Sequence, residues 1–280
     1  MKFAVFAKLM HRGFHRVLYI ILSPYRLFKF LCFVIGFFVL FSFVGGGIFF
    51  YSFWKSLPEF ENRHFSELKQ LTQKLVLKKM KDKKKPYDWT SLDQINKDYL
   101  YAIVMSEDGT FFEHEGINYG AIADALAENI RKRRYVSGAS TISQQVVKNL
   151  FLSNRKTLVR KLREVLITTD LEKHFTKNQI LELYLNLAEF GPDVFGVGMA
   201  ADVFFQKKPS EINAAEGAFI ALMLPAPARN YYSVYQNRNL TFLKKRKMRR
   251  ILRDMLHFEF ISEDQYRQYL QYSYPHEKKG

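Results

Sequence analysis

The feature that most constrains this chain is an uncharged run near its N-terminus. From Phe30 to Trp54 there are 25 residues, FLCFVIGFFVLFSFVGGGIFFYSFW, without a charged side chain. At about 1.5 Å per residue, a helix of this length crosses a hydrocarbon core of roughly 30 Å. A cleaved signal peptide has a shorter apolar core followed by small residues, whereas this run ends in aromatic residues that suit a membrane interface. We expect an uncleaved transmembrane helix at residues 30–54.

The flanking charges predict how this helix is oriented. Residues 1–29 carry six basic residues and no acidic one, so the positive-inside rule predicts a cytoplasmic basic tail there and an extracytoplasmic location for the residues after the helix. Subtracting these six from the 43 basic residues leaves 37, against 27 acidic ones. A basic segment outside the membrane favours anionic lipid head groups and lipid-linked phosphates as partners, and nucleic acid is not expected.

The rest of the chain indicates one folded, mainly α domain. Six of the eight residues from Lys78 to Lys85 are lysines, and Pro86 comes next, so we expect a basic linker over residues 55–88. Helical apolar periodicity begins near residue 89. Two capping boxes, Thr176 with Gln179 and Ser262 with Gln265, predict helix starts. We expect the domain over residues 89–260 and a C-terminal helix and tail over residues 261–280.

The segment SEDGTFFEHEG contains the first candidate catalytic side chains. Glu107 and Asp108 come after an apolar helix pattern and precede Phe111 and Phe112. A carboxylate beside side chains that exclude water has a raised pKa, which suits a general base near neutral pH. The same residue types also form a turn with a capping acid, and this segment alone does not decide between the two interpretations.

Two further segments combine polar groups with helix patterns. In SGASTISQQVVKNLF, hydroxyl and amide side chains beside an apolar run suit sugar binding, a helix N-terminus capped by Ser140, or both together. In RKTLVRKLREVL, the pattern places Arg160, Lys161, Arg163 and Glu164 opposite the leucines. This face is either a solvated surface with an Arg160–Glu164 ion pair or a diphosphate clamp with a second carboxylate.

Taken in order, these segments resemble the peptidoglycan glycosyltransferases, the family of the monofunctional transglycosylases and of the first catalytic module of class A penicillin-binding proteins. The matching positions are Glu107, Asp108, Phe111, His114 and Gly116 in a first motif, Gly138, Ser140, Thr141, Gln144, Gln145 and then Lys148 in a second, Arg160, Lys161 and Glu164 in a third, and Ile180, Leu181, Glu182, Tyr184, Leu185 and Asn186 in a fourth. The glycine-rich segment LAEFGPDVFGVGMAA and the lack of transpeptidase signatures favour the monofunctional members.

The resemblance implies a lysozyme-like, mainly α glycosyltransferase domain with a small membrane-associated hydrophobic subdomain. It implies Glu107 and Glu164 as catalytic residues, the first as general base and the second as an organiser of the groups around the leaving diphosphate. The implied substrate-binding residues are Asp108, Ser140, Thr141, Gln144, Gln145, Lys148, Arg160, Lys161, Arg163 and Asn186. The implied structural residues are Phe111, His114, Gly116, Gly138 and Tyr184.

The implied reaction transfers the growing lipid-linked glycan chain onto the 4-hydroxyl of lipid II, with inversion and release of undecaprenyl diphosphate. No organic cofactor is expected, and Mg²⁺ or Mn²⁺ is a candidate divalent cation. The implied partners are lipid II, the growing chain, membrane lipids and other cell-wall synthesis and division proteins. The implied location is the bacterial cytoplasmic (inner) membrane.

Two positions depart from the family pattern, and two other classes of protein remain open. Asn118 stands where an acid is usual, and Gly198 stands where a glutamate is frequent. Neither is a predicted catalytic carboxylate, so these departures bear on how the substrate is positioned. A lysozyme-like hydrolase or lytic transglycosylase also places an acid on a helical fold, but it needs no bases for a diphosphate. A membrane-anchored scaffold without catalysis is distinguished from an enzyme only by an assay.

Overall fold

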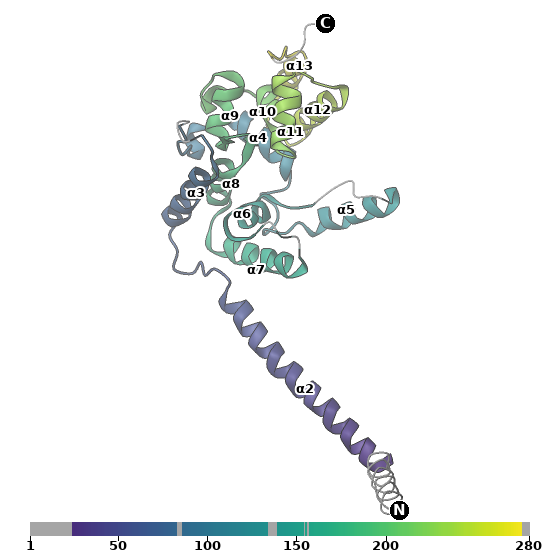
Figure 1. The fold of residues 1–280 in the computed structure, drawn as a ribbon. Helices are drawn as coiled ribbons and strands as arrows, with labels where there is room; N and C mark the ends of the chain where they lie inside the picture. Colours follow the sequence, from purple (N-terminus) through teal and green to yellow (C-terminus); the bar gives the residue numbers. More distant parts are fainter. Residues whose placement is uncertain (1–23, 83–85, 134–138, 154, 156, 276–280) are drawn as a thin grey trace, which may run out of the picture. The chain divides into compact units, whose positions relative to one another are not determined.

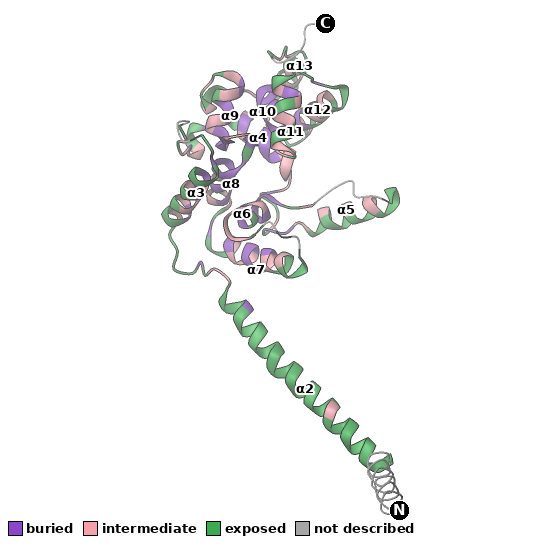
Figure 2. Cartoon of the chain, viewed as in Figure 1, coloured by how far each residue is buried: buried purple, intermediate pink, exposed green. Residues whose placement is uncertain are grey.

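The structure is a computed structural model that describes residues 24–82, 86–133, 139–153, 155 and 157–275 (Figure 1). It divides into two compact units, residues 1–57 and 58–280. The first contains α2 (Pro24–Lys55), which includes the whole uncharged run. Among the described residues α2 is the one helix long and apolar enough to cross a membrane. Its large apolar side chains are exposed almost throughout (Figure 2), as a helix in contact with lipid requires.

The second unit is mainly helical, which confirms the predicted fold class. Its helices are α3 (Phe65–Lys79), α4 (Lys97–Glu107), α5 (Tyr119–Lys132), α6 (Ile142–Phe151), α7 (Leu158–His174), α8 (Lys177–Leu187), α9 (Gly196–Phe205), α10 (Ala214–Ala221), α11 (Pro227–Asn230), α12 (Phe242–His257) and α13 (Glu263–Leu270). Short 3₁₀ turns η1 (Leu92–Gln94) and η2 (Pro209–Glu211) and a π-helical turn η3 (Tyr231–Gln236) join them. An antiparallel pair, β1 (Glu189–Gly191) and β2 (Val194–Phe195), aligns Glu189 with Phe195.

The core of this unit forms around α10, which is buried along its whole length and packs on α4 and α12. Close packing depends on Gly217, because a Cβ there would lie 2.9 Å from the Cβ of Ala102 and 3.2 Å from the Cα of Tyr99. A second contact set joins α6 to α7 and α8. The last residue of α4 and the first turn of α6 are thereby held on well-packed helices.

The region expected to be a linker contains a packed helix. Leu68, Thr72 and Val76 of α3 are buried, and α3 packs on α8. These positions are spaced by four residues and share one helix face, while the lysines of α3 occupy the other positions. A linker was predicted here because the lysines are the most prominent feature of the sequence. The structure instead has a packed helix over residues 65–79.

Helix α7 is turned differently from the sequence prediction. Glu164 is buried with 2% of its surface exposed, whereas Leu158 and Leu162 are 90% and 53% exposed. Apolar side chains of this helix are buried toward its end, at Leu171 and at Phe175, the residue that ends the helix. Glu164 is therefore not on a solvated surface, although the Arg160–Glu164 ion pair of that interpretation does form.

Candidate active site

A cavity of about 610 Å³ lies where α4 ends and α5 and α6 begin. The N-cap of α6, Thr141, and the start of α5 form part of its wall. The lining residues are Glu107, Asp108, Gly109, Thr110, Glu113, His114, Asn118, Gly120, Ala121, Asp124, Ala139, Ser140, Thr141 and Phe258. The cavity thus brings together the first two predicted motifs.

Glu107 is the last residue of α4, and burial raises the pKa of its carboxyl above the ordinary value of 4.5. Gln145, on the first turns of α6, donates a hydrogen bond from Nε2 to Glu107 Oε2 over 3.1 Å. This bond and the charges of Lys247 and Lys148 lower the pKa of Glu107, while the charge of Asp108 raises it. The site therefore contains a carboxylate with the environment of a general base.

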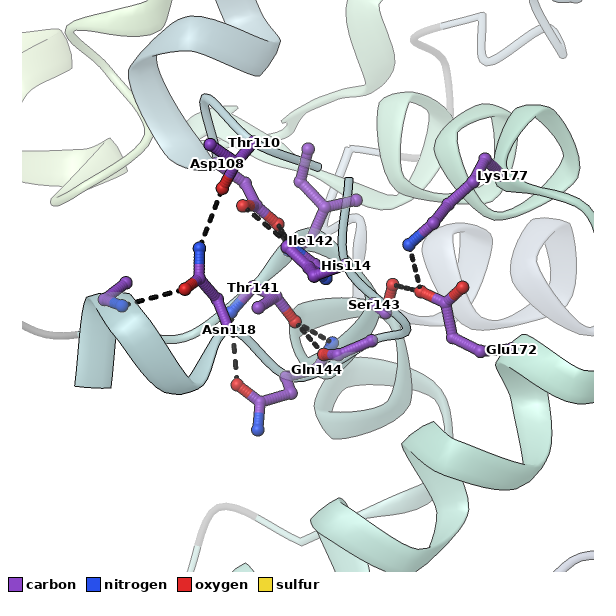
Figure 3. Close-up of polar contacts among 12 residues, drawn as sticks. Asp108, Thr110, His114, Asn118, Thr141, Ile142, Ser143, Gln144, Glu172 and Lys177 are labelled. Carbon is purple, nitrogen blue, oxygen red and sulfur yellow. Dashed lines mark hydrogen bonds and ion pairs between the residues drawn. The ribbon is translucent and has the colours of Figure 1, made fainter. Parts of the chain in front are cut away.

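Asp108 braces the loop after α4 rather than standing free in the cavity. His114 Nε2 lies 3.0 Å from Asp108 Oδ1, and the backbone N–H of Ile142 donates to Asp108 Oδ2 over 3.0 Å. Figure 3 shows His114 and Ile142 meeting at this carboxylate. Asp108 is thus one of the direct links between the first motif and the first turn of α6, and its predicted substrate contact competes with these internal partners.

The loop closes at Gly116, where the backbone has a φ of +83° that side chains disfavour. A Cβ at this position would lie 2.8 Å from Glu172 Cγ and 2.9 Å from Thr168 Cγ2. The carbonyl of Gly116 accepts a hydrogen bond from Thr141 Oγ1 over 2.6 Å. Gly116 therefore closes the loop as a glycine, because no other residue fits both the backbone and the space.

A polar contact chain that the sequence does not predict lies beside this loop (Figure 3). Ser143 Oγ donates a hydrogen bond to Glu172, and Lys177 Nζ forms an ion pair with Glu172 over 2.9 Å. The same ammonium lies 4.5 Å from the ring centre of Phe111, which is fully buried. No spacing pattern could predict this contact chain, because it joins α6, α7, α8 and the loop in space only.

The first turn of α6 corrects two predictions. The N-cap is Thr141, not Ser140, because Thr141 Oγ1 accepts from the backbone N–H of Gln144. Gln144 is buried and its Oε1 accepts in turn from the N–H of Thr141, so its side chain completes a capping box instead of facing a substrate. Ser140 remains exposed on the cavity wall, and Gln145 contacts Glu107.

The bases of α7 enclose Glu164. Arg160 Nη1 lies 2.9 Å and Lys161 Nζ 2.5 Å from its carboxylate oxygens. Glu164 does not line the cavity that contains Glu107. This arrangement supports an organising role for Glu164 over proton transfer, because both carboxylate oxygens already bind cations. Lys148 on α6 is exposed, and its charge reaches both Glu107 and Lys79, whose pKa values it lowers.

The fourth motif is built into the fold. Asn186 is 1% exposed, and its amide donates to the carbonyl of Thr90 and accepts from the N–H of Thr90, both over 2.8 Å. Its predicted substrate contact is therefore corrected to a structural role. Tyr184 is buried, as a structural residue should be, and the charges of Glu107 and Asp108 help to raise its pKa. Gly138 lies outside the described residues.

The two departures from the family pattern have different surroundings. Asn118 caps α5 by accepting from the N–H of Ala121, and its Nδ2 donates to Thr110 Oγ1 over 2.8 Å (Figure 3). It thus joins the cavity loop to α5. Gly198 lines a separate cavity of about 560 Å³, where a Cβ would lie 2.6 Å from Thr90 Oγ1. A glutamate at residue 198 would require Thr90 to move.

Among the described residues no cluster of three or more His, Cys, Asp or Glu side chains could hold a metal ion. Asp108, the carboxylate next to Glu107, already binds His114 and a backbone N–H. The described side chains therefore do not by themselves provide a ligand set for the candidate Mg²⁺ or Mn²⁺.

Residues 73–256 match the protein family described as Transglycosylase, and the chain belongs to that family. This membership confirms the predicted resemblance and the enzyme class, peptidoglycan glycosyltransferase.

Three similar curated relatives share one description, biosynthetic peptidoglycan transglycosylase. The relative from Laribacter hongkongensis is 43% identical over 162 residues, which are 58% of this chain and 70% of that protein. The relative from Pectobacterium carotovorum is 46% identical over 142 residues, 51% of this chain and 58% of that protein. The relative from Nitrosospira multiformis is 44% identical over 164 residues, 59% of this chain and 69% of that protein. The matched region thus spans between about three fifths and seven tenths of these relatives.

Proposed function

We propose that this chain polymerises the glycan strands of peptidoglycan from lipid II at the cavity around Glu107. The observation that carries the proposal is the half-buried carboxylate of Glu107, which lines a cavity large enough for sugar rings and receives a hydrogen bond from Gln145. Family membership and the descriptions of the relatives support the same substrate class.

In the proposed reaction Glu107 takes the proton from the 4-hydroxyl of the acceptor sugar. The oxygen attacks C1 of the growing chain at its lipid-linked end, the bond from C1 to the diphosphate oxygen breaks, and undecaprenyl diphosphate leaves with that bond's electron pair. A single displacement inverts the configuration at C1. The proton rests on Glu107, whose raised pKa suits its uptake.

The leaving diphosphate requires cations, and the described residues supply them on two helices. Lys148 is exposed on α6 close enough to influence Glu107, and Arg160 and Lys161 are fixed by Glu164 on α7. Charge-assisted hydrogen bonds from such groups stabilise the negative charge that develops on the departing oxygen. A divalent cation would bind through the diphosphate's own oxygens.

The second unit also presents an apolar surface suited to a lipid-linked substrate. On α5, Tyr119, Ile122, Leu126 and Ile130 share one helix face and are 40% to 75% exposed. Leu158, Val159 and Leu162 at the start of α7 are exposed as well. An exposed set of this kind marks an interaction surface, and we propose that it enters the outer leaflet.

We propose a single-pass topology to match this reaction. The tail before α2 is cytoplasmic and the second unit extracytoplasmic, where lipid II is polymerised. Other wall-synthesis and division proteins are proposed partners.

The test is incubation of purified full-length protein with fluorescent lipid II, then gel separation with and without lysozyme. A ladder of glycan chains that lysozyme digests is the expected result. Well-folded protein that binds lipid II but yields no polymer would overturn the proposal in favour of a scaffold. Release of short products from preformed glycan would instead indicate a lytic enzyme.

A further inference from the structure

The cavity of about 560 Å³ beside Gly198 lies outside the proposed reaction site. It is lined by parts of the segment that begins at Pro86, by the first half of α9 and by η2. It shares no lining residue with the cavity around Glu107, and α9 lies apart from α5 in Figure 1. No step of the proposed reaction uses this cavity, so its lining indicates a second site.

Trp89 provides the cavity with an aromatic ring that is fixed in place. Its Nε1 donates a hydrogen bond to Glu182 Oε1 over 2.8 Å, and the ammonium of Lys69 lies 5.0 Å from the ring centre. The next residue, Thr90, also lines the cavity and is held by the amide of Asn186. A ligand that packs on this ring does not have to order it first, which lowers the entropic cost of binding.

The polar part of the lining favours a neutral ligand that is rich in hydroxyl groups. It offers both hydrogen-bond acceptors and donors, from Asp88, Gln94, Asp202 and Lys208. The two carboxylates outnumber the one ammonium among these residues, so the lining repels phosphate groups. The ammonium of Lys208, together with the one already over the ring of Trp89, opposes a cationic ligand.

A sugar ring matches both parts of this lining. Its C–H groups pack on an aromatic ring and on apolar side chains such as Met199 and Pro209. Its hydroxyl groups donate to carboxylates and accept from amide and ammonium groups. The volume lies within the range of roughly 300–1,000 Å³ that is usual for small-ligand sites. We propose that this cavity binds a sugar unit of a glycan strand. The choice of a glycan rests on the proposed function, because such a strand is the proposed product.

Gly198 keeps this wall of the cavity free of a side chain. A Cβ at residue 198 would lie 2.6 Å from Thr90 Oγ1, which is too close for either group to stay in place. A glutamate at this position would extend farther from the same wall. Because glutamate is frequent here in the family, the proposed site distinguishes this chain from relatives with that side chain.

The test uses full-length protein in neutral detergent micelles with chitotetraose, a soluble oligosaccharide, as the probe. Titration calorimetry gives the affinity. In a Trp54→Phe background Trp89 is the one tryptophan left in the chain, so its fluorescence reports on the cavity itself. We expect both signals to saturate over the same range of sugar concentration.

A matched pair of aspartate variants locates the binding. Asp202→Ala should bind the sugar at least about tenfold more weakly, because hydrogen bonds to a charged group are lost. The control Asp124→Ala removes an exposed acid from α5 that lines the reaction cavity instead, and it should bind like the background protein. No measurable binding, or equal binding by the two variants, would overturn the proposal.

A second pair blocks the cavity while leaving Asp202 in place. Thr90→Ala removes the oxygen that lies nearest to residue 198 and should retain binding. Thr90→Ala/Gly198→Glu then has space for the Cβ, and its longer side chain should abolish binding. Thermal unfolding checks that both variants are folded. Retained binding by the folded double variant would overturn the proposal.

Trilysine serves as the probe for a peptide ligand. Binding of trilysine that depends on Asp202, without binding of the sugar, would assign the cavity to a cationic peptide and overturn the proposal. None of these measurements requires polymerase activity, so failure of the proposed function would be recognised separately in the lipid II assay.

Discussion

Gln145 Nε2 donates a hydrogen bond to Glu107 Oε2 over 3.1 Å and joins the first turns of α6 to the end of α4. The bond stabilises the ionised carboxylate, while burial favours the protonated form and raises the pKa of Glu107. The strength of the proposed base is therefore set by two opposing effects that can be changed separately.

Replacing Gln145 with leucine should move the pH dependence of polymerisation. Loss of the donor raises the pKa of Glu107 further, so the acidic limb of the rate profile should shift to higher pH. Initial rates of lipid II consumption across pH would measure the shift. The control Gln179→Leu removes a glutamine from the capping box of α8 and should leave the midpoint unchanged. An unshifted profile in Gln145→Leu would show that this bond does not tune the base.

Replacing Glu107 with glutamine should stabilise the fold at neutral pH. The pKa of Glu107 is raised in the folded state, so wild-type stability is highest below the unfolded pKa and falls as pH rises through the folded pKa. The variant lacks this loss. Thermal unfolding should therefore give similar midpoints near pH 4 and a higher midpoint for the variant at pH 8. A lower midpoint at pH 8 would contradict the assignment of burial as the dominant effect.

Gly116→Ala should destabilise the protein by about 1–3 kcal/mol, because the left-handed backbone and the missing space both oppose a Cβ. The control is Gly120→Ala, where the nearest atom lies at 3.5 Å and the residue is helical. This control should raise the free energy of unfolding by less than about 1 kcal/mol. Chemical unfolding monitored by circular dichroism measures both. Equal effects would show that the loop tolerates a side chain at residue 116.

Thr141→Ala should cost about 1 kcal/mol through the lost cap of α6, and Ser140→Ala should cost close to nothing. Unfolding midpoints of the two variants compare the residues directly. A larger loss at Ser140 would contradict the capping assignment.

Helix starts were predictable from sequence where local chemistry decides them. The capping boxes at Thr176 and Ser262 begin α8 and α13 as predicted, because each depends on groups within three residues. At the start of α6, Ser140 and Thr141 both have a hydroxyl group that can cap a helix. Thr141 is the N-cap, because Gln144 follows it by three residues and completes the capping box.

Features that depend on tertiary packing were not predictable. Periodicity shows that the leucines of α7 share one face but not what covers that face, and Leu158 at the start of the helix is 90% exposed. Lys247 was missed because α12 and α4 are far apart in the sequence and meet only in the fold. Asparagine also occurs in sugar-binding sites, so the residue type does not reveal the role of Asn186. Its hydrogen bonds to Thr90 can be recognised only in the structure.

The central claim is that Glu107 is the base of a polymerase, and the most direct measurement compares polymerisation rates of Glu107→Gln and Glu115→Gln with that of the wild type. Glu115 is an exposed acid in the same loop that does not line the cavity. We predict that Glu107→Gln lowers the rate at least about 100-fold while lipid II binding persists, because a positioned base contributes on this order. Glu115→Gln should polymerise like the wild type. A Glu107→Gln protein that forms glycan chains at the wild-type rate would contradict the account.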